Sequence, residues 1–120
     1  MTKLDKFTLA YIECALWSSY DNSDSSGGNP LDSNYSIKDI APETMKKIKE
    51  DCKKFQSDNL EDIQDNLEGA GHDFWLTRNC HGAGFWDGDW PTSIGIHLTN
   101  KSHAFGECDL YVGDDGKIYC

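Results

Sequence analysis

The sequence lacks any apolar run of the roughly 18–20 residues that a membrane-spanning helix needs. Its first eight residues also lack the basic stretch and apolar stretch of a secretory signal peptide. These absences predict a protein without a membrane segment that stays in the cytoplasm. Arginine is scarce as well, because Arg78 is the only one among the 11 basic residues. The 21 acidic residues leave a net charge of −10, which argues against direct nucleic-acid binding, since that affinity comes from basic side chains.

The five cysteines include no C-x-x-C pair, which argues against a zinc knuckle or a dithiol redox motif. Without an export signal, we expect reduced thiols. Cys14 and Cys52 fall on apolar helical stripes and are predicted to be small core residues, whereas the terminal Cys120 is expected at the surface.

Metal-binding motifs are also missing. The run from Asn22 resembles the start of a calcium loop, but Ser33 occupies the position where an EF-hand needs glutamate. His72 and His81 are nine residues apart and form no helical H-E-x-x-H motif. We therefore expect no metal, no cofactor and no set of catalytic residues. The sequence favours a function other than catalysis, without deciding it.

What the sequence does contain is enough apolar material for one core. Hydrophobic residues make up 38% of the chain, and there are 4 Trp, 5 Tyr and 5 Phe. A disordered acidic segment would be poor in aromatic residues. At 120 residues, the chain is predicted to form a single domain spanning residues 1–120.

The first half, to about residue 69, has helical periodicity. One helix is predicted from an apolar stripe at Leu4, Phe7, Tyr11, Cys14 and Ala15. After a loop over residues 18–36, a second helix should begin near Pro42, because proline suits the first helical turn. A third, shorter helix should begin at Asp58 and end at Gly69 or Gly71.

The second half, about residues 70–120, suggests strands. Runs at 74–77, 85–86 and 94–96 are rich in aromatic or β-branched residues, although 98–105 could be a short helix. The clearest signal is a hairpin of 109–112 and 117–119 around a turn with Asp115-Gly116. The expected class is α+β, with two or three N-terminal helices packed on a small C-terminal antiparallel sheet.

One segment, Gly71–Trp90, concentrates chemistry-bearing side chains. It holds three of the four tryptophans, two of the four histidines and the only arginine. Aromatic faces and one arginine suit a base and a phosphate, so the segment predicts a small-ligand site. Its candidates are Trp75, Arg78, Asn79, His81, Trp86 and Asp87. The competing interpretation is structural: the tryptophans fill the core, and Arg78 pairs with Asp73 or Asp109.

Charge is distributed unevenly along the chain. Residues 38–54 hold six lysines against four acids, whereas residues 55–76 hold six acids and no lysine or arginine. An acidic face can bind basic grooves of other proteins and speed encounter with them. The candidates for such a protein-interaction face are Asp58, Glu61, Asp62, Asp65 and Glu68. The alternative is that these charges only keep a small protein in solution.

Three blocks of the sequence point to a family. Gly71–Asn79 (GHDFWLTRN), His81–Asp87 (HGAGFWD) and Asp109–Tyr119 (DLYVGDDGKIY) resemble signature blocks of small acidic bacteriophage-encoded proteins. That family has no assigned activity, so the resemblance carries over no catalytic residue. It implies expression in the cytoplasm of an infected bacterial host. The family pattern has glycine where this chain has Cys80, which argues against a nucleophilic role for that cysteine.

Three functions remain as hypotheses. The first is a non-enzymatic protein that binds a host protein with a basic nucleic-acid-binding groove and inhibits a host defence system of the restriction or CRISPR type. The second is a nucleotide-binding protein or small hydrolase that uses the Trp75–Asp87 segment. The third is an accessory protein of the virion.

Overall fold

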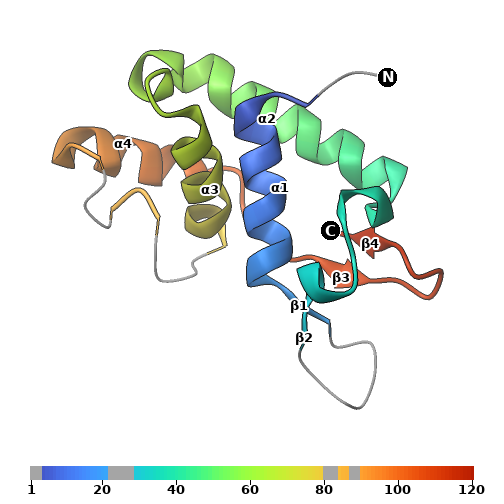
Figure 1. Cartoon of the computed structure of the whole chain (residues 1–120). Coiled ribbons are helices and arrows are strands. Elements are labelled where there is room, and N and C mark those ends of the chain that lie inside the picture. The colour runs from blue at the N-terminus through green and yellow to red at the C-terminus, as the bar shows by residue number, and fades with distance from the viewer. Residues whose placement is uncertain (1–3, 22–28, 80–83, 87–89) are drawn as a thin grey trace.

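The computed structural model describes residues 4–21, 29–79, 84–86 and 90–120. Within this part of the chain there are four α-helices, two short 3₁₀ helices and two antiparallel pairs of very short strands (Figure 1). The elements are α1 (Lys6–Ser18), β1 (Tyr20–Asp21), β2 (Asn29–Pro30), η1 (Leu31–Ser33), η2 (Ile37–Asp39), α2 (Pro42–Ile63), α3 (Leu67–Arg78), α4 (Thr92–His103), β3 (Tyr111–Val112) and β4 (Ile118–Tyr119). The class is α+β, as predicted.

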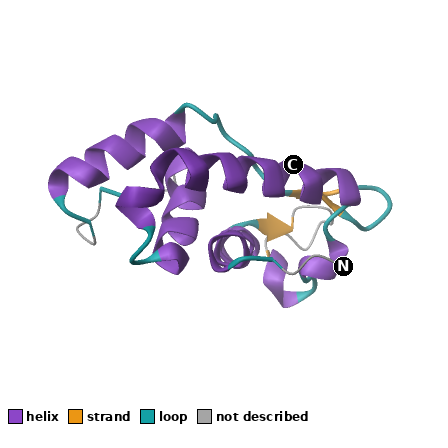
Figure 2. Cartoon of the chain, turned by 90° about the horizontal axis from the view of Figure 1, so that it is seen from above, coloured by secondary structure: helices purple, strands orange, loops and turns teal. Residues whose placement is uncertain are grey.

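The helices α1 and α3 pack side by side, and α2 contacts both (Figures 1 and 2). Asp5 caps α1 by accepting a hydrogen bond from the backbone N–H of Thr8 at 2.8 Å. The close approach of α1 and α3 requires glycine at position 71, because a Cβ there would overlap the carbonyl oxygen of Phe7.

Aromatic side chains fill the space between the helices. The rings of Phe55 on α2 and Phe74 on α3 stack with their centroids 4.3 Å apart. Phe7 and Tyr11 of α1 also contact Phe74, at 5.9 and 5.4 Å, and Phe7 lies 5.7 Å from Phe55 as well. These four rings are fully buried, and such ring pairs stabilise the core beyond the area they bury. The predicted stripe of the first helix is thereby confirmed as a core face.

The C-terminal hairpin of β3 and β4 is also confirmed. Tyr111 pairs with Tyr119, and Val112 pairs with Ile118. The hairpin joins the helical body where the backbone N–H of Ala41 donates to the carbonyl oxygen of Ile118 at 2.9 Å, just before α2 begins. Pro42 occupies the first turn of α2, as expected.

Several predicted elements are wrong. Residues 74–77 belong to α3 and residues 94–96 to α4, while 85–86 form a turn. The described part of the second half therefore holds two helices and one hairpin rather than mainly strands. The run at 74–77 is buried on all sides, and a short apolar run has the same pattern in a buried strand and a buried helix. The helix predicted to begin at Asp58 is instead the end of α2, which continues through a kink at Asn59.

The expectation that all thiols are reduced is wrong for one pair of cysteines. Cys108 and Cys120 form a disulfide, with their Cα atoms 5.6 Å apart, because the hairpin brings the two ends of the segment together. Cys14 and Cys52 are free and buried, as predicted. Burial raises the pKa of Cys14 to about 12 and also raises the pKa of Cys52.

Candidate functional site

The predicted ligand residue Arg78 lies in the core. Its side chain is 1% exposed. The Nη1 atom donates to Asp51 Oδ2 at 3.0 Å and to the Tyr11 hydroxyl at 3.1 Å. Nε and Nη2 donate to the carbonyl oxygens of Gly106 and Phe105, at 2.9 and 3.2 Å. The ion pair expected under the structural interpretation is therefore present, but its carboxylate is Asp51 rather than Asp73 or Asp109.

The surroundings of the guanidinium are aromatic. Its central carbon lies 5.4 Å from the ring centroid of Phe74 and 5.8 Å from that of Phe105, within the range of cation–π attraction. Burial raises the pKa of Tyr11, whose hydroxyl accepts from Arg78, so the phenol stays neutral. Arg78 thus joins α1, α2, α3 and the segment after α4.

The other predicted ligand residues are divided between core and surface. Trp75 is 1% exposed and donates from Nε1 to Ser18 Oγ at 2.7 Å. Asn79 donates to the carbonyl oxygen of Trp75 and accepts from the backbone N–H of Cys108 at 2.7 Å. Trp86 is 46% exposed. His81 and Asp87 lie outside the described residues.

The five acidic candidates all reach the surface, where α2 ends and α3 begins. We call them the acidic surface: Asp58, Glu61, Asp62, Asp65 and Glu68. Asp58 lies 3.7 Å from Lys54, and Asp62 lies 3.9 Å from the imidazole of His97 on α4. The remaining three have no ion-pair partner among the described residues.

The acidic surface is hollowed. A depression of about 400 Å³ is lined by Asp58, Asn59, Leu60, Glu61, Asp62, Ser57 and His97. Leu60 is 51% exposed there. Asn59, which is 3% exposed, donates to the carbonyl oxygen of Phe55, while its Oδ1 atom has no partner among the described residues. This is the only buried side-chain oxygen or nitrogen in the described part of the chain that is left unpaired.

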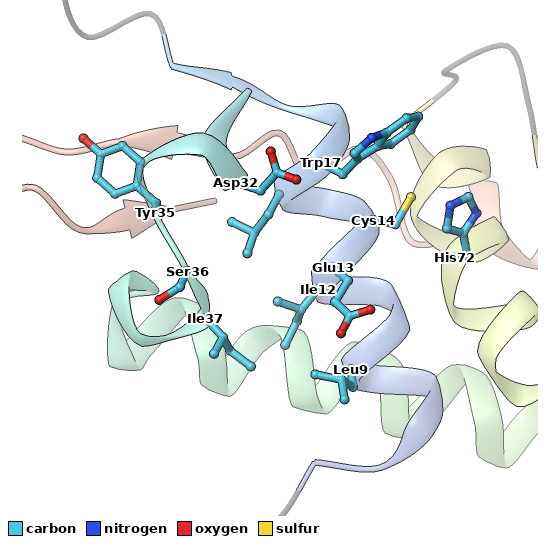
Figure 3. A pocket seen from close by; sticks show the side chains of 11 residues that line it. Leu9, Ile12, Glu13, Cys14, Trp17, Asp32, Tyr35, Ser36, Ile37 and His72 are labelled. Carbon is cyan, nitrogen blue, oxygen red and sulfur yellow. The ribbon is translucent and has the colours of Figure 1, made fainter. Parts of the chain in front are cut away.

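A larger groove, which no pattern in the sequence predicted, runs along α1. It has a volume of about 640 Å³ (Figure 3). We call it the α1 groove; its lining is Leu9, Ile12, Glu13, Cys14, Leu16, Trp17, Asp32, Tyr35, Ser36, Ile37 and His72. The available signal was that Leu9 and Trp17 are apolar residues of the first helix outside its core stripe. They are 41% and 61% exposed.

The described residues include neither a cluster of metal-ligating side chains nor a membrane-spanning helix. No three His, Cys, Asp or Glu side chains among them are grouped so that they could hold a metal ion. None of the helices described here has the length and apolar character needed to cross a bilayer. Searches against known protein families, curated proteins and solved structures find no match to the chain.

Proposed function

We propose that the protein acts without catalysis, by binding a basic partner protein through the acidic surface. The observation that carries this proposal is the position of Glu61 and Asp62 in the last turn of α2. A helix C-terminus already carries a partial negative charge, and carboxylates beside it increase the negative potential. No basic residue of α2 lies in that turn to offset it.

This arrangement works against stability. Acidic side chains at a helix C-terminus cost about 0.3–1 kcal/mol each, because they face the negative end of the helix dipole. Glu68, by contrast, lies in the first turn of α3, where the dipole favours an acid. Local features that oppose folding are expected at functional sites. A concentrated negative potential of this kind accelerates encounter with a positively charged groove.

This contrast gives a direct prediction for stability. Glu61→Gln and Asp62→Asn should each raise the free energy of unfolding by a few tenths of a kcal/mol to about 1 kcal/mol. Glu68→Gln, on the same surface, should lower it by a similar amount. Urea unfolding at low and high salt measures both changes, and salt should shrink them. Equal effects of all three substitutions would contradict the dipole argument.

In the bacteriophage context that the sequence resemblance implies, the partner is a host defence nuclease with a basic nucleic-acid groove. The test uses purified restriction and CRISPR effector nucleases and measures their DNA cleavage with and without the protein. One variant neutralises the acidic surface at Asp58, Glu61, Asp62 and Asp65. The control neutralises four exposed acids elsewhere, Glu50, Glu107, Asp109 and Asp114.

Neutralising four acids changes the net charge from −10 to −6, so both variants carry the same net charge. If the acidic surface is the contact, inhibition of cleavage should fall tenfold or more in the first variant and stay near wild type in the control. Loss of inhibition should also follow rising salt. An equal loss of inhibition in the two variants would show that net charge, rather than this surface, matters. No inhibition of any nuclease by the wild-type protein would overturn the defence context.

The small-ligand alternative has less support. Four of the five N–H groups of Arg78 already donate to protein oxygens, and its side chain is only 1% exposed, so it is poorly placed to bind a phosphate. A thermal-shift screen against nucleotides tests the alternative directly. The virion hypothesis stays a prediction that mass spectrometry of purified particles would test.

A further inference from the structure

Three residues on the outer face of α1 form a stripe at four-residue spacing. Leu9, Glu13 and Trp17 follow one another at this interval, so they lie on one side of the helix (Figure 3). Leu9 and Trp17 are separated by eight residues, which corresponds to about 12 Å along a helix, or about two turns. Each is a large apolar side chain with much of its surface in solvent. Such exposed apolar residues in a row mark an interaction site more often than an isolated one does.

The groove beside this stripe has an apolar floor. Ile12 and Leu16 of α1 are 1% and 6% exposed, and Ile37 of η2 is half-buried against the core. Tyr35 lines the wall opposite α1, and His72 of α3 lies on the other side of Trp17 (Figure 3). Because the volume of about 640 Å³ is open along the helix, the groove has room for a row of side chains from a second helix.

The charges of the groove are all of one sign. Glu13 stands between Leu9 and Trp17, and Asp32 of η1 lines the groove as well. Neither carboxylate has an ion-pair or hydrogen-bond partner in the part of the chain that the structure describes. No lysine or arginine of the described residues lines the groove. An occupant that matches these features is apolar at both ends and positively charged between them.

We propose that the α1 groove binds a helical segment of a partner protein. The segment has two apolar side chains about two turns apart, which contact Leu9 and Trp17, and a lysine or arginine between them, which pairs with Glu13 and Asp32. Tryptophan is among the residues that most often dominate binding energy at interfaces. This site goes beyond the proposed function, because it shares no residue with the acidic surface.

A displayed library of helical 16-residue peptides tests the proposal. Its positions vary among apolar, acidic, basic and polar residues, and selection is against the full-length protein. We expect enrichment of peptides with apolar residues seven or eight positions apart and a lysine or arginine between them. No enrichment, or enrichment of peptides with an acidic residue in the centre, would overturn the proposal.

Synthetic versions of the selected peptides are then measured by fluorescence anisotropy. Leu9→Ser with Trp17→Ser should weaken binding about tenfold or more, as expected for an interface anchor. Glu13→Gln should weaken it less and should reduce its dependence on salt. The matched control, Ile96→Ser with Tyr111→Ser, removes two apolar residues that are 58% and 56% exposed and lie away from the groove, and it should leave affinity unchanged.

Urea unfolding checks that every variant is folded before its affinity is compared. Binding that is lost equally in the control variant would mean nonspecific hydrophobic adsorption and would overturn the proposal. So would binding that survives in the Leu9 and Trp17 variant. The variant with a neutralised acidic surface should bind the peptides normally. A failure of the proposal for the α1 groove can therefore be distinguished from a failure of the proposal for the acidic surface.

Discussion

Replacing Arg78 with methionine removes the guanidinium but keeps a long apolar side chain in its place. The carbonyl oxygens of Phe105 and Gly106 and the hydroxyl of Tyr11 each lose a donor, and Asp51 loses its ion-pair partner. Breaking a buried ion pair by removing one partner typically costs about 3–5 kcal/mol. The Asp51 side chain is 22% exposed, so part of its hydration returns and the lower half of that range is expected.

Equilibrium unfolding in urea, followed by far-ultraviolet circular dichroism, measures this loss. With a denaturant slope of about 2 kcal/mol/M, a loss of about 3–4 kcal/mol lowers the midpoint by roughly 1.5–2 M. Such a change is a large share of the 5–15 kcal/mol that folded domains commonly have. The matched control is Lys54→Met, because Lys54 forms only an exposed ion pair, which contributes about 0–1 kcal/mol.

Two further variants identify the cause of the Arg78 effect. Arg78→Lys keeps the charge but cannot donate in the fork geometry, so it should rescue only a small part of the stability. Asp51→Asn should cost less than Arg78→Met, and the double variant should cost less than the sum, with a coupling of about 1–3 kcal/mol. A loss below 1 kcal/mol in Arg78→Met, or strict additivity with Asp51→Asn, would refute the structural role of this pair.

Further predictions concern packing and cysteines. Gly71→Ala should cost about 1–3 kcal/mol, because its methyl group would push α3 away from the Phe7 backbone; an unchanged melting temperature would contradict this close contact. Cys120→Ser should lose about 2–4 kcal/mol and abolish the sensitivity of the melting temperature to reductant that wild type should show. In the folded protein, Cys14 and Cys52 should resist alkylation at pH 8, as peptide mapping by mass spectrometry can check. Their raised pKa values stabilise the fold fully below pH 9, and this contribution should disappear as the pH rises towards 12, which urea midpoints at pH 8 and 10.5 would detect.

The sequence was sufficient for those parts of the fold that depend on local signals. The apolar stripe of α1, the proline at the start of α2 and the Asp115-Gly116 turn are each encoded within a few residues. The acidic surface could be found in the same way, because exposed charges follow directly from an excess of one sign in a short segment. Its candidate residues are at the surface, as that interpretation requires.

The helix α4 shows why local signals failed elsewhere. Thr92, Ile94 and Ile96 are β-branched residues, which favour a strand locally. In the structure Gly95 lets α4 approach the carbonyl oxygen of Phe85, which lies only 2.6 Å from where a Cβ would be. Packing against a distant segment therefore decided the helix, and no local pattern contains that information.

By itself, the sequence determined the α+β class, the aromatic core and the location of the acidic surface, because these depend on composition and short-range periodicity. Only the tertiary structure decided what Arg78 does, since its partner Asp51 is 27 residues away and its two carbonyl acceptors lie in another segment. The α1 groove likewise exists only because η1 and η2 fold back beside Leu9 and Trp17. Side chains that are distant in sequence form a site or a core when folding places them together. A local sequence pattern contains no information about which distant residues will meet.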